Sequence, residues 1–335
     1  MPESESARPV VAVLTAPDEG RPPGLEPLDA KAEVVHATDP DSLRDALERA
    51  DVLMVTDFRS TMLQDAWPHA RHLQWVHATS AGVDALMFPE LVESDVPVTN
   101  ARGIFDRAIA EFVLGQILAF AKDLPASLEL QRAHRWQHRD TERIMDKTVL
   151  VVGAGAIGRS IARMVRAAGM QALGLARRAR AHDPDFERVY AAESLHTALP
   201  RADFVVVAAP LTEATRGMFG QAAFHRMKRS ARLINIGRGP VVETGALVQA
   251  LRDGELAGAA LDVFEQEPLP DDHPLWGLDN VILTAHMAGD FIGWREALST
   301  QFLENFRRWE EGRPLENVVD KTRGYVVDQP ERRQA

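Results

Sequence analysis

Residues 148–170 read TVLVVGAGAIGRSIARMVRAAGM, and this stretch decides the fold. Its first five residues are β-branched or aliphatic, which predicts a buried strand that ends at Gly153. Two further glycines follow at Gly155 and Gly158, and apolar residues then recur at helical spacing. A strand, a glycine-rich turn and an amphipathic helix in direct succession predict the start of a parallel α/β sheet.

The three glycines predict a dinucleotide site. In such a turn the first glycine permits the tight bend, the second lets the backbone approach a pyrophosphate, and the third lets helix and strand pack closely. The phosphates would lie at the helix N-terminus, where Ala156 and Ile157 are expected to offer backbone N–H groups. The alternative is a glycine-rich turn in some other α/β protein, which the flanking strand and helix disfavour.

Further apolar runs predict more strands, separated by segments with helical spacing. They cover residues 10–16, 51–56, 73–79, 204–210, 232–237 and 281–287. Continuous apolar runs are typical of parallel strands that are covered on both faces. The pattern therefore predicts an α/β fold, and a length of 335 residues favours two domains.

The domain boundaries follow from two predicted helices. Residues 106–121 are apolar at helical spacing on almost the whole circumference, as expected of a connector buried between domains or subunits. A terminal helix over residues 291–311 would return the chain to the first domain. We expect a dinucleotide-binding domain at residues 103–287 and a discontinuous substrate domain at residues 1–102 and 288–335.

Composition limits the possible function classes. The formal net charge of −11 repels polyanions, so neither nucleic acid nor an anionic membrane is an expected partner. The chain has no cysteine, which excludes disulfides, thiolate nucleophiles and cysteine-ligated metals. His134 and His138 have metal-ligand spacing but lie in a polar stretch, so no metal site is expected. The acidic N-terminus resembles no export signal, which predicts a cytoplasmic protein without a membrane span.

The strand at residues 171–176 indicates which dinucleotide is bound. A site for NAD usually has an acidic residue at the end of this strand to hold the ribose 2′-hydroxyl, but here the strand ends in Ala176. Arg177, Arg178 and Arg180 follow, and their guanidinium groups would accept a 2′-phosphate. We predict that NADP is preferred and that NAD is possible; a solvated basic loop is the alternative interpretation.

Three charged or titratable residues follow predicted strands. Arg238 lies between two glycines after residues 232–237, Glu267 precedes Pro268, and His286 ends the run at residues 281–287. Ligands of open parallel sheets bind at the carboxyl ends of the strands, so these residues are expected to converge. Reduction of a 2-oxo acid needs a carboxylate clamp, a hydride source and a proton donor. Arginine, nicotinamide and histidine meet these needs.

Seven stretches resemble the D-isomer-specific 2-hydroxyacid dehydrogenase family in content, order and spacing. They are VHATSAGVD, VTNARGIFDRAIAEFVL, VLVVGAGAIGRSIA, VVVAAPLTEATRGMFG, LINIGRGPVVETGAL, GAALDVFEQEPLP and TAHMAGD. The resemblance covers most of the chain. It implies two doubly wound parallel-sheet domains, with a Rossmann cofactor domain inserted in a flavodoxin-like substrate domain. It also implies a glyoxylate or hydroxypyruvate reductase-like activity.

The same resemblance implies roles for individual residues. Arg238 would clamp the substrate, Glu267 would partner the catalytic histidine, and His286 would be the acid/base. The substrate carboxylate would be held by backbone groups at Ser80, Ala81 and Gly82. Pro210 and Thr215 would border the adenosine half of the cofactor. The nicotinamide would be lined by Ile236, Gly237, Asp262, Ala288 and Gly289.

Several alternatives stay open at this point. Formate dehydrogenase shares the fold but pairs its histidine with glutamine, so Glu267 disfavours it. A nucleotide-sensing regulatory protein, similar to the C-terminal-binding-protein corepressors, keeps the same three residues. Trp294 either caps the substrate pocket or, as we expect, packs the terminal helix, and Phe58 is a weak candidate for the pocket wall. The apolar helix at residues 106–121 predicts a homodimer.

Overall fold

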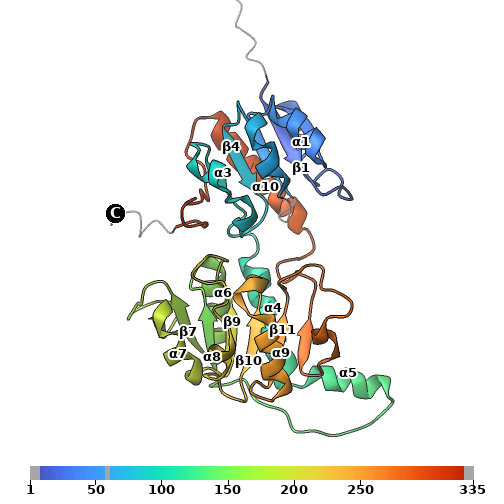
Figure 1. The fold of residues 1–335 in the computed structure, drawn as a ribbon, viewed down its shortest axis with the longest axis vertical. Coiled ribbons are helices and arrows are strands. Elements are labelled where there is room, and N and C mark those ends of the chain that lie inside the picture. Colours follow the sequence, from blue (N-terminus) through green and yellow to red (C-terminus); the bar gives the residue numbers. More distant parts are fainter. Residues whose placement is uncertain (1–7, 57–60, 328–335) are drawn as a thin grey trace, which may run out of the picture. The chain divides into compact units, whose positions relative to one another are not determined.

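The computed structural model describes residues 8–56 and 61–327, and the chain divides into two compact units (Figure 1). Unit 1 comprises Met1–Ile104 and Phe291–Ala335, and unit 2 comprises Phe105–Asp290. The sequence-based boundaries fall slightly earlier, at 102 against 104 and at 287 against 290. Each unit has its own parallel sheet, so the predicted α/β class with two doubly wound domains is confirmed.

Unit 1 is built on a five-stranded sheet of order β2-β1-β3-β4-β5 in which all neighbours run parallel. This is the flavodoxin-like order. The strands are β1 (Val10–Leu14), β2 (Glu33–Ala37), β3 (Val52–Val55), β4 (Trp75–Ala78) and β5 (Val98–Thr99). The helices are α1 (Pro40–Leu47), α2 (Met62–Ala66), α3 (Pro89–Glu93) and α10 (Trp294–Glu310), with short 3-10 turns at Glu26–Ala30, Trp67–His69 and Asp84–Leu86.

Two apolar clusters cover the two faces of this sheet. One joins α1, α2 and α3 to the strands through residues such as Leu43, Leu63 and Leu91. The other joins α10 to the opposite face, where the Phe302 ring stacks on Trp75 with centroids 5.2 Å apart. The C-terminal helix therefore completes the core of the unit that begins at the N-terminus.

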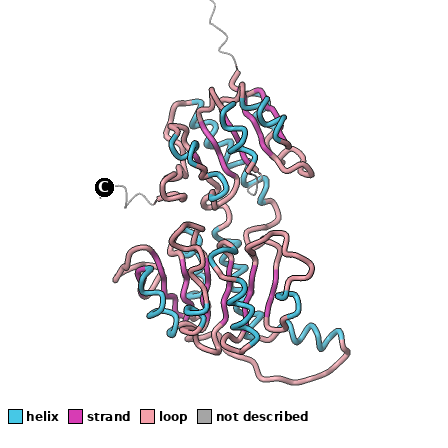
Figure 2. Tube along the Cα trace, viewed as in Figure 1, coloured by secondary structure: helices cyan, strands magenta, loops and turns pink. Residues whose placement is uncertain are grey.

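Unit 2 is built on a seven-stranded parallel sheet of order β12-β11-β10-β9-β6-β7-β8. Figure 2 shows strands in magenta with helices and loops around them. The order reverses at β6, the strand that precedes the glycine-rich turn, as in a Rossmann domain. The strands are β6 (Thr148–Val152), β7 (Gln171–Ala176), β8 (Arg188–Ala191), β9 (Phe204–Val207), β10 (Arg232–Asn235), β11 (Gly258–Leu261) and β12 (Val281–Leu283). The 3-10 turns are Ala192–Ser194, Leu199–Arg201, Gly239–Val241 and Pro274–Gly277.

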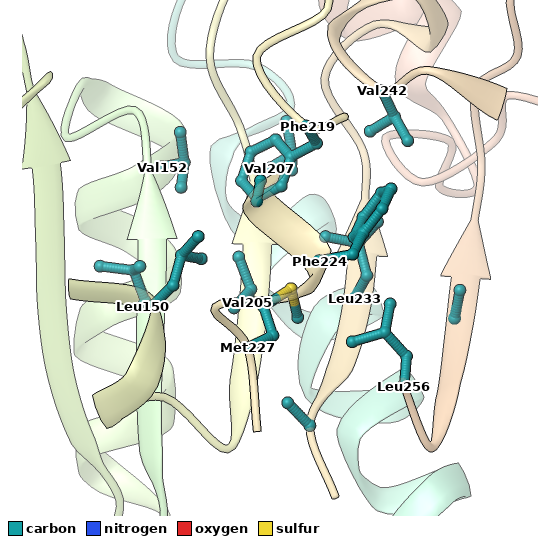
Figure 3. Packing of buried hydrophobic residues seen from close by; sticks show 14 of the residues in the cluster. Leu150, Val152, Val205, Val207, Phe219, Phe224, Met227, Leu233, Val242 and Leu256 are labelled. Carbon is teal, nitrogen blue, oxygen red and sulfur yellow. The ribbon is translucent and has the colours of Figure 1, made fainter. Parts of the chain in front are cut away.

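Helices cover both faces of the second sheet because alternate strand residues point to opposite sides. On one face Leu150, Val205 and Leu233 pack against Phe224 and Met227 (Figure 3). That face is covered by α7 (Leu195–Ala198), α8 (Gln221–Phe224) and α9 (Thr244–Arg252). The other face is covered by α4 (Asp106–Ala121) and α6 (Ala156–Ala167).

Helix α4 has the predicted bounds, and it packs through Ile109, Val113 and Ile117. The following helix α5 (Leu124–Arg132) has no buried residue, and Leu124 and Leu128 on it are about half exposed. Of the helices within residues 8–56 and 61–327, none is long and apolar enough to cross a bilayer.

Candidate active site

The glycine-rich turn after β6 has the geometry that its sequence predicts. Gly153 has φ +108°, and a Cβ there would lie 2.6 Å from the Ala208 carbonyl oxygen on the neighbouring chain segment. A Cβ on Gly158 would lie 1.9 Å from the Gly153 oxygen. Both positions therefore require glycine, the first for conformation and the second for close packing.

Gly155 differs, because a Cβ there would meet nothing within 4 Å. This residue is the N-cap of α6, and no side chain accepts a hydrogen bond from the first turn of the helix there. Ala156 and Ile157 begin the helix, so their N–H groups face the open side of the turn. An uncapped helix N-terminus beside an open glycine fits a pyrophosphate, as a dinucleotide site requires.

The segment after β9 is folded around a threonine. Thr215 Oγ1 donates to the Pro210 carbonyl at 2.7 Å and accepts from the Thr212 N–H at 2.8 Å. The predicted adenosine-side residues Pro210 and Thr215 thus belong to one compact turn at the carboxyl end of β9, next to β6 in the sheet.

The three arginines that follow β7 differ in their surroundings. Ala176 is the last residue of the strand, and Arg177 and Arg178 after it are exposed. Arg180 instead forms an ion pair with Asp183, with 3.0 Å between Nε and Oδ2. Arg180, which the sequence analysis grouped with Arg177 and Arg178, therefore has a carboxylate partner three residues further along the loop.

The carboxyl ends of β11 and β12 bring an acid and a histidine together. His286 Nδ1 lies 2.8 Å from Glu267 Oε2, and the other carboxylate oxygen accepts the Phe264 N–H at 3.0 Å. Burial raises the pKa of the Glu267 carboxyl, but the hydrogen bonds from His286 and Phe264 outweigh it, so the pKa lies below its usual value. Glu267 is therefore a carboxylate at neutral pH, placed to orient the imidazole.

Asp262 fixes the loop that carries the histidine. Its carboxylate accepts from Thr284 Oγ1 at 2.6 Å and from the N–H groups of Met287 and Ala288 at 3.0 and 2.8 Å. The His286 N–H donates to the Asp262 carbonyl at 2.8 Å. His286 has φ +52°, a left-handed conformation that a non-glycine residue adopts at some cost. These bonds hold it there, so Asp262 positions the histidine, a role that the sequence did not predict.

Arg238 lies in a turn wedged between two neighbouring segments. A Cβ on Gly237 would lie 2.8 Å from the Ala209 oxygen, and one on Gly239 would lie 1.9 Å from the Phe264 carbonyl carbon. The Arg238 turn therefore packs directly on the segment at Phe264, whose N–H donates to Glu267. Ile236, which precedes it, is buried.

A buried asparagine closes the same turn. Asn235 is 1% exposed; its Nδ2 donates to the Arg238 carbonyl at 3.2 Å and its Oδ1 accepts the Gly237 N–H at 3.1 Å. The sequence analysis did not identify Asn235, because only side chains expected to touch the cofactor or substrate were considered. The available signal was an asparagine at a strand end two residues before a glycine, which is typical of a side chain that bonds the following backbone.

Ala288 and Gly289 complete this part of unit 2. Ala288 is buried, and a Cβ on Gly289 would lie 2.9 Å from the Phe105 ring. Position 289 therefore has no room for a side chain.

The predicted carboxylate-binding residues belong to unit 1, in the loop after β4. Ser80 Oγ donates to the Gly82 carbonyl at 2.6 Å, and the Ala101 N–H donates to the Ser80 carbonyl at 3.0 Å. Asn100, which is 3% exposed, donates to the Ala81 carbonyl at 2.6 Å. The loop is thus fixed by a second buried asparagine that the sequence analysis did not identify.

Four further residues were considered in the sequence analysis as pocket or metal-binding candidates. Trp294 is the first residue of α10, with the Arg295 guanidinium 4.4 Å from its ring centroid. Phe58 lies outside the described residues. His134 and His138 lie on an exposed loop and not on a helix, and the described ranges contain no group of three potential metal ligands.

Comparison with known proteins places this geometry in a family. The family model described as D-isomer specific 2-hydroxyacid dehydrogenase, NAD binding domain, matches residues 114–288, just over half of the chain. A glyoxylate reductase from Thermofilum pendens is 34% identical over 283 residues, which cover 80% of each chain. The chain belongs to the D-isomer specific 2-hydroxyacid dehydrogenase family.

Solved structures agree with this assignment. An NADPH-dependent glyoxylate/hydroxypyruvate reductase from Sinorhizobium meliloti, in complex with NADP and sulfate, superposes with a TM-score of 0.82 at 32% identity, covering 95% of this chain and 100% of that one. A family member from Xanthobacter autotrophicus in complex with NADPH gives 0.79 at 33%, with 95% and 100% covered. The protein is therefore an oxidoreductase that uses NAD or NADP.

Proposed function

We propose that the protein reduces a small 2-oxo acid, such as glyoxylate or hydroxypyruvate, to the D-2-hydroxy acid with NADPH. The observation that carries the proposal is the 2.8 Å contact between His286 and Glu267, at the sheet edge where the glycine-rich turn and Arg238 also lie. Bound nicotinamide supplies the hydride to the carbonyl carbon.

His286 delivers the proton to the carbonyl oxygen. The Glu267 carboxylate accepts the Nδ1–H, which fixes the tautomer and the orientation of the ring. Arg238 binds the substrate carboxylate with its planar guanidinium. Backbone groups at Ser80, Ala81 and Gly82 are proposed to bind the same carboxylate.

NADPH is proposed as the preferred cofactor because β7 ends in Ala176 and two exposed arginines follow. The NADP complexes of the Sinorhizobium meliloti and Xanthobacter autotrophicus proteins support this choice. A charge-assisted contact to a 2′-phosphate contributes about 1.5–3 kcal/mol, so even one corresponds to roughly tenfold or more in kcat/KM.

The test is a steady-state screen of 2-oxo acids of graded size with NADPH and NADH. We expect the highest kcat/KM for a two- or three-carbon 2-oxo acid with NADPH. A protein that binds the dinucleotide but turns over none of these acids would be a nucleotide-sensing regulatory protein. Oxidation of formate without reduction of any 2-oxo acid would instead support formate dehydrogenase, which Glu267 disfavours.

A further inference from the structure

The loop that follows β7, residues 177–187, is fixed to helix α6 by paired charges. Arg159 on α6 makes two parallel hydrogen bonds to Asp183, with 2.9 Å between Nη1 and Oδ1 and 2.9 Å between Nη2 and Oδ2. Arg159 Nη1 also lies 2.8 Å from Asp185 Oδ2. A two-pronged guanidinium–carboxylate pair restrains orientation as well as distance.

Asp183 also holds the loop from within. Arg180 Nε lies 3.0 Å from Asp183 Oδ2, and Arg180 Nη2 donates at 3.4 Å to the carbonyl of Ala154, between the first two glycines of the turn. The Asp185 N–H donates to Asp183 Oδ1 at 3.0 Å. One carboxylate thus connects the loop to the helix and, through Arg180, to the glycine-rich turn.

The Asp183 side chain is 1% exposed. Its charge is therefore poorly screened by water and is compensated by the guanidinium groups of Arg159 and Arg180. Those hydrogen bonds and charges outweigh the effect of burial and keep the pKa of the Asp183 carboxyl below its usual value. The Asp183 carboxyl is therefore ionised at neutral pH and can pair with both guanidinium groups there.

The location of this link matters for cofactor choice. Residues 177 and 178 begin the loop, at the strand end where the ribose 2′ position of a dinucleotide is recognised. The N-terminus of α6 is the pyrophosphate end of the same site. The link therefore fixes the spacing between the two places where the cofactor carries phosphate.

We propose that Asp183 is a positioning residue that sets the preference for NADPH over NADH, because it holds residues 177–187 against α6 through Arg159 and Arg180. The inference rests on the proposed cofactor preference. A loop that is already ordered loses less entropy when its arginines bind the 2′-phosphate, and NADH lacks the group that would exploit this order.

The expected change in NADPH affinity is opposite to the change that loss of a negative charge alone would cause. A carboxylate near a 2′-phosphate repels it, so removing a negative charge should by itself strengthen NADPH binding. Loss of the link should weaken NADPH binding. Glu187, an exposed acid of the same loop, provides the matched control, because Glu187→Ala removes the same charge and leaves the Asp183 contacts intact.

The experiment measures dissociation constants for NADPH and NADH by fluorescence titration of the full-length wild type, Asp183→Ala and Glu187→Ala. We expect Asp183→Ala to weaken NADPH binding about tenfold while NADH changes much less, so that the affinity ratio falls. Glu187→Ala should leave the ratio unchanged or raise it slightly. Asp183→Asn, which keeps one acceptor for Arg159, should give an intermediate ratio and replaces the alanine variant if that one does not fold.

Two results would overturn the inference while leaving the cofactor preference intact. One is a wild type that prefers NADPH together with an Asp183→Ala variant of unchanged or raised ratio. The other is an equal loss for both nucleotides, which would make Asp183 a structural residue only. A wild type that binds both cofactors equally, or NADH better, overturns the proposed preference and the inference with it.

Discussion

At the scale of single residues, the contact between His286 and Glu267 determines how the imidazole is held for proton transfer. Because the pKa of Glu267 is lowered, the glutamate is anionic wherever reduction is measured near neutral pH, and it can accept a hydrogen bond from His286 throughout that range. Reduction needs the protonated ring and should fall as pH rises, whereas oxidation needs the neutral ring and should improve.

Glu267→Gln should lower kcat for reduction by a smaller factor than loss of His286, because a neutral amide holds the imidazole less strongly than the carboxylate does. His286→Ala should lower kcat for reduction by about 10²–10⁴. Full pH profiles of kcat in both directions, with cofactor binding as the folding control, are the measurement. A His286→Ala variant with near-normal turnover would show that His286 is not the proton donor.

A second histidine affects stability instead. His77 is fully buried beside Thr99, and burial lowers its pKa to about 3. The folded protein therefore keeps His77 neutral, while the unfolded chain binds a proton below about pH 6.5. Stability contributed by this difference is present above pH 6.5 and is lost at about 1.4 kcal/mol per unit as pH falls toward 3.

The prediction for His77 is tested with urea unfolding at pH 7.5, 6.0 and 5.0. His77→Gln should flatten the fall in unfolding free energy between these pH values, whatever its absolute stability. His72→Gln, at an exposed histidine of the same unit, is the control and should keep the wild-type slope. Equal slopes in the wild type and His77→Gln would mean that protonation of His77 does not drive acid unfolding.

At the scale of elements, strand ends carry the site, and the turns after them are held by buried asparagines. Asn235→Ala removes both hydrogen bonds that close the Arg238 turn. Each such bond contributes about 0.5–1.5 kcal/mol, so KM for the 2-oxo acid should rise roughly tenfold. The dissociation constant for NADPH should change less.

Asn235→Asp is the informative companion, because the acid keeps an acceptor for the Gly237 N–H and loses only the donor to Arg238. Its KM should lie between those of the wild type and Asn235→Ala. If both variants raise the NADPH dissociation constant and KM together, Asn235 supports the whole domain and not the Arg238 turn alone.

Some strands and helices could be predicted from the sequence, and others could not. Long buried strands and helix α4 were predictable because burial on both faces leaves an unbroken apolar signal. Strands β2, β5 and β8 were not predicted: β2 is partly exposed at the sheet edge, β5 has two residues, and β8 carries an exposed arginine. The fold class followed from the central strands, whereas edge strands depend on tertiary pairing that no local pattern encodes.

The residues of the candidate site also differ in whether the sequence could predict them. Residues that act through their own side chains, such as Arg238 and His286, could be placed at strand ends from spacing alone. Asn235, Asn100 and Asp183 act on backbone groups or on other charges. Asn235 bonds the backbone two and three residues further on, whereas Asn100 and Asp183 have partners 19 and 24 residues away. Only the folded chain shows that Arg180 faces Asp183 and that Asp262 holds the histidine loop.

At the scale of the whole molecule, several large apolar side chains on and after α5 are exposed. Leu124 and Leu128 on α5 are 47% and 52% exposed. Trp136, on the loop that follows α5, is fully exposed, and Met145 further along the chain is 65% exposed. Large apolar side chains exposed on neighbouring parts of the sequence are typical of an interaction surface. Since α4, directly before α5, is apolar on almost its whole circumference, we predict that a second copy of the chain covers these side chains.

The predicted homodimer can be tested by one substitution. Trp136→Ser removes a fully exposed aromatic side chain and should weaken dimerisation by roughly 30-fold or more, because a buried interface tryptophan commonly contributes over 2 kcal/mol. Light scattering after size-exclusion chromatography at micromolar concentration measures this as a shift toward the monomer mass. Trp276→Ser, at a tryptophan that is 56% exposed in the 3-10 turn Pro274–Gly277, is the control and should leave the dimer intact. A wild type that is monomeric at these concentrations would refute the homodimer and leave α4 as a core element of unit 2.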